Sequence, residues 1–532
     1  MKSKALRTVL AFYGPDEADS GRAYESLASS KGNRVYRCGP AGSAEIPSDE
    51  PWARYRAVRL DDECVIIVRT AADGVQSAVQ KFQGAGSPAV FVLSDGPDAP
   101  ALSPDLESPV TELDEDFARV LAKRRGQAGP SKQNILPQLL RDERMLEESR
   151  SELAQAFRLE HVPTASAEWL LDNGYLIRTQ IAEIRRHLPR RYHQILPAGD
   201  SGDPYIYELA RRLAANSNYT LDEANIEQCL RRYQEIAPLT IAELWSFPLL
   251  LRVALIRALT KLAVRISRAQ EMREAAYFWA NRLAAGSRWS AQVFGRMLQR
   301  MEAEPIALEP YFLVCLAEQL QDEEEALAPL QDWIEERLGK PLTEVVRIEH
   351  TREAAESIST ANAFGSLRAL SQIEFADLFE SVSLVEAELR TDPGGIYPHT
   401  DFATRDRCRR AVERISRHCG AAELDVARRA IALAARDAGS RNGHVAYYLI
   451  DQGVLELEAE TGARTSRRTR LLRLIRRRAT PVYLTGIVGL SLCFTAISLG
   501  LAWNDGVRQE AMLIVLGVLA LFPLSELSVQ IV

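Results

Sequence analysis

The chain has 532 residues, 46% of them hydrophobic, which is enough for two or three folded units, so a single domain is not expected. Its formal net charge of −7 gives no general attraction to nucleic acid, and nucleic-acid binding is therefore excluded as the expected function. The seven cysteines are scattered without a Cys-x-x-Cys pair, which predicts reduced thiols rather than disulfides or a zinc site.

Residues 1–130 alternate short β-rich runs with helical runs, which predicts a small α/β domain followed by a linker. We expect strands at 8–13, 34–37, 64–69 and 89–93, and helices at 19–29, 74–83 and 114–125. Because the apolar runs at 65–68 and 89–93 are continuous, the strands should be covered on both faces, as in a mostly parallel sheet.

The turn after the first strand does not have the form of a phosphate-binding loop. It reads Gly14-Pro15-Asp16-Glu17, which places acidic residues where a phosphate would lie. We therefore expect this domain to have a docking or sensing role inside a larger protein rather than to bind a nucleotide.

From residue 132 to about 460 the apolar spacing is helical, which predicts a mainly α-helical cytoplasmic region. The first helix should bury a face formed by Leu139, Leu146, Leu153 and Phe157. Its opposite face should carry Arg141, Asp142, Glu143, Glu147 and Glu148. Further helices are expected at about 252–284, 287–303, 310–337, 366–390, 403–417, 422–436 and 442–450.

Two pairs of residues in this region have the spacing of capping boxes, in which a hydroxyl and a carboxylate satisfy each other's backbone amides. The pairs are Thr220 with Glu223 and Thr240 with Glu243. Each pair predicts the start of a helix.

Two apolar stretches, residues 481–503 and 511–532, follow with only a short loop between them. The first has 23 residues without a charge, which at about 1.5 Å per residue exceeds the roughly 30 Å hydrocarbon core of a bilayer. Thr480 should cap the first helix and Pro481 should begin it. We predict a two-helix transmembrane hairpin. A buried pair of core helices is the alternative, and both the length and the basic flank argue against it.

The juxtamembrane segment 461–480 is rich in arginine, and Arg473, Arg476, Arg477 and Arg478 lie closest to the first stretch. The loop of the hairpin carries a single basic residue, Arg508. By the positive-inside rule the long N-terminal region stays in the cytoplasm. Since basic residues beside a membrane attract anionic lipid, these arginines, with Thr480 and Pro481, are the predicted membrane anchor and the lipid bilayer is the predicted partner.

Several short sequence motifs follow one another along the helical region and the hairpin. They include Ala167-Glu168-Trp169-Leu170-Leu171-Asp172-Asn173, Val382-Ser383-Leu384-Val385-Glu386, Asp392-Pro393-Gly394-Gly395-Ile396-Tyr397, and Pro523-Leu524-Ser525-Glu526-Leu527. Together they resemble the N-terminal region of the cyclic β-1,2-glucan synthases. The resemblance covers about residues 132–532 and leaves residues 1–130 unmatched.

The resemblance implies a multi-pass enzyme of the bacterial inner membrane, a processive glucosyltransferase that polymerises glucose from UDP-glucose and cyclises the product. This chain would be its membrane-anchoring and scaffolding part, with the glycosyltransferase and cyclisation domains of the same synthase as partners. The catalytic domain is expected after residue 532, and UDP-glucose and a divalent cation are expected only there. The alternative is a self-standing two-span inner-membrane sensor or scaffold with a cytoplasmic helical interaction region.

No catalytic, cofactor-binding or metal-binding residue is predicted in this segment. Asp114-Glu115-Asp116 is formally Asp-x-Asp, but no strand precedes it. Arg288-Trp289 matches the end of the Gln-x-x-Arg-Trp word of processive glycosyltransferases, but Ala285 stands where glutamine is required.

One charged segment remains open to two interpretations. It contains Asp401, Arg405, Asp406 and Arg407 at a loop-to-helix start. It is either a helix cap with local ion pairs or an interface with the catalytic domain.

Overall fold

The computed structural model describes residues 6–13, 17–30, 33–38, 63–71, 74–85, 89–94, 129–130, 134–158, 164–188, 192, 195–198, 202–463 and 479–531. The chain forms two compact units, Met1–Ser383 and Leu384–Val532. The predicted turn at 14–16, the predicted helix at 114–125 and the arginines at 464–478 lie outside the described residues.

The first unit begins with a four-stranded sheet. Its elements are β1 (Leu6–Tyr13), α1 (Glu17–Ala28), β2 (Arg34–Cys38), β3 (Cys64–Ala71), α2 (Val75–Gly84) and β4 (Ala89–Ser94). The strand order is β2-β3-β1-β4, and all three pairings are antiparallel. This βαββαβ order is the ferredoxin-like arrangement. The expected strands and the two described helices are confirmed, but the mostly parallel sheet is wrong.

The error has a physical cause, because both faces of this antiparallel sheet are covered. One face, with Val9 and Ile66, packs against α1 and α2. The other face, with Phe12 and Phe91, packs against Phe278 of a long helix more than 180 residues further along the chain. The continuous apolar runs therefore predicted correctly that both faces of the sheet are covered. They carried no information about the direction of the strands.

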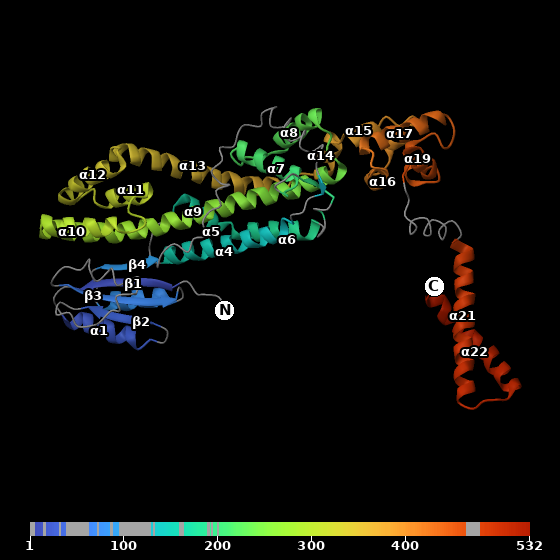
Figure 1. The fold of residues 1–532 in the computed structure, drawn as a ribbon, viewed down its shortest axis with the longest axis horizontal. Helices are drawn as coiled ribbons and strands as arrows, with labels where there is room; N and C mark the ends of the chain where they lie inside the picture. The colour runs from blue at the N-terminus through green and yellow to red at the C-terminus, as the bar shows by residue number, and fades with distance from the viewer. Residues whose placement is uncertain are drawn as a thin grey trace. The chain divides into compact units, whose positions relative to one another are not determined.

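The rest of the first unit is a layer of helices arranged around α9 (Ile241–Trp289), which has 49 residues. The other helices are α4 (Leu136–Arg158), α5 (Ala165–Asp172), α6 (Gly174–His187), α7 (Tyr205–Asn216), α8 (Glu223–Ile236), α10 (Ala291–Glu302), α11 (Pro310–Gln319), α12 (Glu324–Leu338), α13 (Leu342–Ala369) and α14 (Phe375–Val382). A short pairing joins β5 (Gly129–Pro130) to β6 (Pro197–Ala198). Figure 1 shows α9 running through the layer with α4 and α13 on opposite sides. Because neighbours surround it, α9 buries side chains around its whole circumference.

Helix boundaries differ from the prediction in three places. The expected helix at 252–284 is the middle of α9, and the one at 310–337 is divided into α11 and α12. The expected helix at 366–390 combines the end of α13 with α14 and the next short helix. Most of α13 was missed, because its middle residues are polar and largely exposed and only its two ends are buried.

One of the two predicted capping boxes is confirmed. At the start of α9, the Glu243 amide donates to Thr240 Oγ1 at 3.2 Å, and the Thr240 amide donates to Glu243 Oε2 at 2.9 Å. The other prediction is wrong, because α8 is capped by Asp222. Its carboxylate accepts from the Asn225 amide at 2.8 Å, and this pair lies two residues after the predicted one.

The predicted apolar face of α4 is correct for Leu139, Leu146 and Leu153, which are buried, and wrong for Phe157, which is exposed. Asp142 is also buried rather than on the solvent side. It lies three residues after Leu139 and four before Leu146, so it shares their face. Burial raises the pKa of Asp142, and the positive charge of Arg257 opposes that shift.

The second unit contains a small bundle and the hairpin. Its elements are α15 (Leu384–Leu389), the 3-10 turn η5 (Tyr397–His399), α16 (Phe402–Cys419), α17 (Glu423–Arg436), α18 (Val445–Ile450), α19 (Val454–Thr461), α21 (Ala479–Asn504) and α22 (Glu510–Ile531). Both α21 and α22 are long and apolar enough to cross a membrane, and their apolar side chains are mostly exposed. The described part of α21 starts at Ala479 and includes Thr480 and Pro481, so the predicted cap at Thr480 lies at the edge of the described residues.

Candidate functional site

The hairpin has the dimensions and the aromatic ends of a membrane span. Tyr483 and Trp503 lie near the two ends of α21, and both side chains are exposed. Trp503 follows Tyr483 by 20 positions, which corresponds to a rise of about 30 Å, the thickness of the hydrocarbon core. Tyrosine and tryptophan prefer the two interfaces of a bilayer, so this spacing fits a membrane-crossing helix.

The contact between α21 and α22 leaves its buried hydroxyls satisfied. Ser491 donates to the carbonyl of Ile487, and Ser528 donates to the carbonyl of Leu524, each at 2.7 Å. A Cβ added at Gly517 would lie 3.4 Å from Leu499 Cδ1, so the two helices approach closely there. Internal hydrogen bonding and close packing are what an apolar solvent demands of a helical pair.

The predicted anchor is described only in part. Thr480 and Pro481 lie at the start of the described part of α21. Arg473, Arg476, Arg477 and Arg478 lie outside the described residues. Their role as a lipid anchor remains a prediction.

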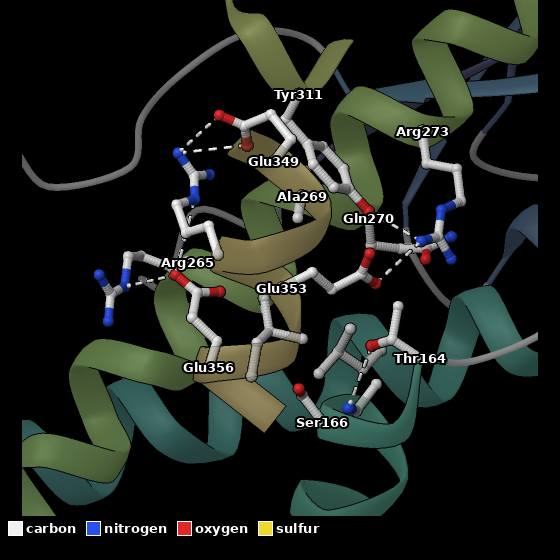
Figure 2. A pocket seen from close by; sticks show the side chains of 14 residues that line it. Thr164, Ser166, Arg265, Ala269, Gln270, Arg273, Tyr311, Glu349, Glu353 and Glu356 are labelled. Carbon is white, nitrogen blue, oxygen red and sulfur yellow. Dashed lines mark hydrogen bonds and ion pairs between the residues drawn. The ribbon is translucent and has the colours of Figure 1, made fainter. Parts of the chain in front are cut away.

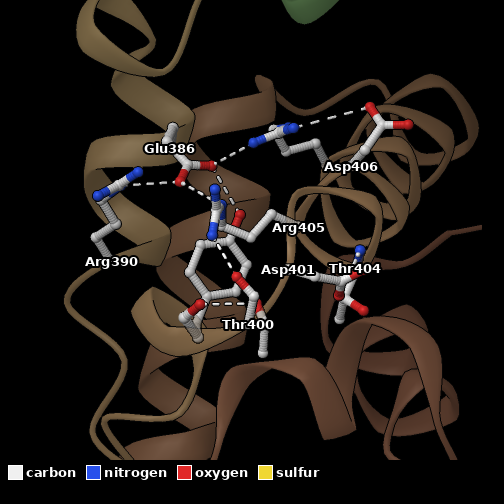
Figure 3. A network of polar contacts seen from close by, with 9 residues as sticks. Glu386, Arg390, Thr400, Asp401, Thr404, Arg405 and Asp406 are labelled. Carbon is white, nitrogen blue, oxygen red and sulfur yellow. Dashed lines mark hydrogen bonds and ion pairs between the residues drawn. The ribbon is translucent and has the colours of Figure 1, made fainter. Parts of the chain in front are cut away.

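The bundle of the second unit is organised around one buried carboxylate, that of Glu386 on α15. It accepts hydrogen bonds from Tyr397 Oη at 2.8 Å, Arg390 Nε at 2.9 Å and Arg409 Nη1 at 2.9 Å (Figure 3). Arg405 Nε lies 3.8 Å from the same carboxylate. Glu386 and Arg409 are both fully buried and form the closest buried ion pair of this network, while Asp406 lies 3.9 Å from Arg409 on its other side.

The four predicted interface residues take different places around this network. Asp401 caps α16 by accepting from the Thr404 amide at 3.2 Å, and the hydrogen bond from Thr404 lowers the pKa of Asp401. Arg405 also donates to the carbonyl of Thr400. Asp406 pairs with Arg410 at 2.6 Å, while Arg407 is exposed.

The helix cap and the local ion pairs are thus present at this segment. An interface with a catalytic domain remains a prediction for these four residues.

Sequence reasoning did not nominate the residues at the centre of this site. Asp392 accepts from the amides of Ile396 and Tyr397 at 3.0 Å and from that of Val445 at 2.8 Å, which joins the turn before η5 to α18. A Cβ at Gly394 would lie 2.7 Å from the Gly443 carbonyl oxygen. Two of the sequence motifs that carry the resemblance contain Glu386 and Asp392. These motifs were the feature of the sequence that could have pointed to this site.

A polar pocket lies in the first unit between α5, α9, α11 and α13 (Figure 2). Its walls hold matched charges, with Arg273 Nη2 2.7 Å from Tyr311 Oη and 3.6 Å from Glu353, and with Arg265 3.5 Å from Glu356. The cavity volume of about 30 Å³ is that of roughly one water molecule. The pocket therefore has no room for a sugar.

The described part of the chain contains no group of three or more His, Cys, Asp or Glu side chains able to hold a metal ion.

No family model matches the chain. The chain is 32% identical over 327 residues, 59% of its length, to a protein described as cyclic beta-(1,2)-glucan synthase NdvB from Rhizobium meliloti (strain 1021). The chain is related to a cyclic β-1,2-glucan synthase. This confirms the resemblance seen in the sequence. The matched region spans 11% of the length of that curated relative.

Proposed function

We propose that the chain is the membrane-anchoring and scaffolding part of a cyclic β-1,2-glucan synthase. The similarity to the Rhizobium meliloti synthase over 327 residues is the observation that carries the proposal. The two apolar helices support it, since a membrane enzyme needs such an anchor. The helical layer around α9 and the bundle around Glu386 would then position the synthase at the lipid boundary.

The proposal includes a location and an orientation. We place the hairpin in the bacterial inner membrane, with both the N-terminal region and residue 532 in the cytoplasm, because the arginine excess precedes the first span. Reporter fusions before Arg464 and after Val532 should both give cytoplasmic signals. A fusion in the loop near Gly506 should give a periplasmic signal. The opposite pattern would refute the orientation.

We further propose that bond formation, with UDP-glucose and a divalent cation, is carried out by other domains of the synthase. The small volume and matched charges of the pocket in Figure 2 support this division of labour. The purified chain in detergent, given UDP-glucose with Mg²⁺ or Mn²⁺, should release no UDP above a heat-inactivated control. Turnover by this chain would overturn the proposal.

A self-standing two-span sensor or scaffold is the second candidate. The βαββαβ part favours it, because this part lies outside the sequence resemblance and has its own packed core. An antibody against residues 202–383 separates the two candidates on membranes of the native organism. A band several times larger than this chain supports the synthase, whereas a band of the chain's own mass supports the sensor.

A further inference from the structure

Helix α16 presents two different faces. Its buried side holds Cys408, Ala411, Val412 and Ile415. Its opposite side carries exposed arginines at a spacing of three or four residues, which places them in one row along the helix. This basic row consists of Arg407, Arg410, Arg414 and Arg417.

The outermost charge on this face is positive. The carboxylates of α16 are Asp406 and Glu413, which pair with Arg410 and Arg417. The side chains of Arg410 and Arg417 are 75% and 52% exposed, against 17% and 18% for their acidic partners. The acids therefore lie beneath the guanidinium groups, and anything that approaches the row meets the guanidinium groups first.

The row is built from arginine alone, since α16 contains six arginines and no lysine. A guanidinium group matches the geometry of a phosphate with two parallel hydrogen bonds, which an ammonium group cannot do. The chemistry of the row therefore fits phosphate oxygens better than scattered single carboxylates.

The chain also limits how far α16 can move from a membrane. The residues between Ala463 and Ala479 number 15 and can span at most about 55 Å when fully extended. If the hairpin crosses the bilayer, the bundle that holds α16 is confined to the adjacent aqueous layer. This step rests on the membrane anchoring set out under the proposed function.

We propose that the basic row of α16 docks onto the phosphate groups of anionic lipids in the membrane that the hairpin spans. The bundle then contacts the leaflet through arginine side chains, with its apolar core kept inside. This contact is separate from the arginines at 464–478 and adds a second attachment point on a folded element.

The test uses the full chain in nanodiscs and the chemical labelling of arginine by phenylglyoxal, read by mass spectrometry. One set of nanodiscs contains phosphatidylcholine only, and the other contains 40% phosphatidylglycerol. Arg407 and Arg414 should react at least about fivefold more slowly in the anionic nanodiscs, and 0.5 M NaCl should remove the difference. Arg185 and Arg186, exposed at the end of α6, are internal controls and should react equally in both.

A double variant sharpens the test. In R407E/R414E the protection of Arg410 and Arg417 by anionic lipid should be lost, whereas R185E/R186E, with the same charge change, should keep it. Equal labelling in both kinds of nanodisc would overturn the proposal. Labelling that is equally slow in both kinds, compared with Arg185 and Arg186, would also overturn it and would assign the row to a protein contact. A chain that does not enter nanodiscs at all would refute the membrane anchoring as well.

Discussion

Each unit of the chain buries an arginine beside a glutamate. One pair joins elements that are far apart in the sequence, and the other joins neighbouring elements. In the first unit, Arg282 Nη1 lies 2.7 Å from Glu63, a residue 219 positions away, and its guanidinium lies 3.9 Å over the ring of Phe12. In the second unit, Glu386 and Arg409 are only 23 positions apart. The first pair joins the sheet to α9, while the second is the centre of a local bundle.

The difference shows what buried charge can do at two distances in sequence. A buried ion pair costs desolvation energy that its own attraction barely offsets, whereas the removal of one partner leaves the other charge buried and poorly compensated. The pair of Arg282 and Glu63 lies where the sheet meets α9. The network of Glu386 joins α15, η5 and α16 within a small bundle. Loss of one partner should therefore disturb different parts of the molecule.

The largest effect is expected for Glu386→Gln. It leaves the buried Arg409 with Asp406, 3.9 Å away, as its remaining acidic partner, and should cost about 3–4 kcal/mol of local stability. Hydrogen exchange of the α16 and α17 amides in the detergent-solubilised chain measures this loss. Glu388→Gln is the matched control, because Glu388 pairs at 3.6 Å with the exposed Arg428 and should cost less than about 1 kcal/mol. Similar exchange in both variants would contradict the central role of Glu386.

The next effect is expected for Glu63→Gln. Glu63 is 17% exposed and Arg282 4% exposed, so the cost should be somewhat lower, about 2–3 kcal/mol. Exchange should rise in β1 and β3 and stay unchanged in α16. Glu323→Gln, which removes the partner of the exposed Arg288, is the control. A change confined to α16 would contradict the assignment of the pair to the joint between sheet and helix.

The joint between the sheet and α9 should also depend on pH. Burial raises the pKa of Glu274 from 4.5 to about 7, and Arg7 opposes the shift. Between these values the native state holds a proton that the unfolded state has lost, so the free energy of unfolding falls as pH rises from 4.5 to 7. With allowance for partial exposure, we expect a loss of about 1–2 kcal/mol.

Urea unfolding of the first unit at pH 5 and pH 7.5 measures this dependence. Glu274→Gln should reduce the difference between the two pH values, and Glu235→Gln, an exposed control on α8, should leave it intact. An unchanged difference in Glu274→Gln would assign the pH dependence to other groups.

The smallest effect is expected for Thr240→Ala, which removes the cap of α9 and should cost about 1 kcal/mol. Thr220→Ala should cost less than that, because Asp222 rather than Thr220 caps α8. Thermal unfolding of the two variants side by side measures both. Equal losses would contradict the caps assigned here.

The sequence was sufficient where a property is local. The strands at the N-terminus, the α9 cap and the apolar hairpin all followed from short patterns. The sequence was insufficient where contacts between residues far apart in the chain determine the structure. Strand direction depends on pairing across the sheet, and the charge that faces the buried Asp142 comes from Arg257 in another helix. Glu386 looks like a solvated helical residue until Arg405 and Arg409 are brought beside it.

The length of α9 has a mechanical consequence. Near its start, Trp245 stacks on Phe379 of α14 with ring centroids 4.7 Å apart, and near its end Phe278 meets Phe91 of the sheet at 5.2 Å. These two contacts lie about 50 Å apart along one helix, which contains Pro248 between them. Because one helix carries both contacts, a tilt or a twist of α9 at the sheet would also displace its far end against α14.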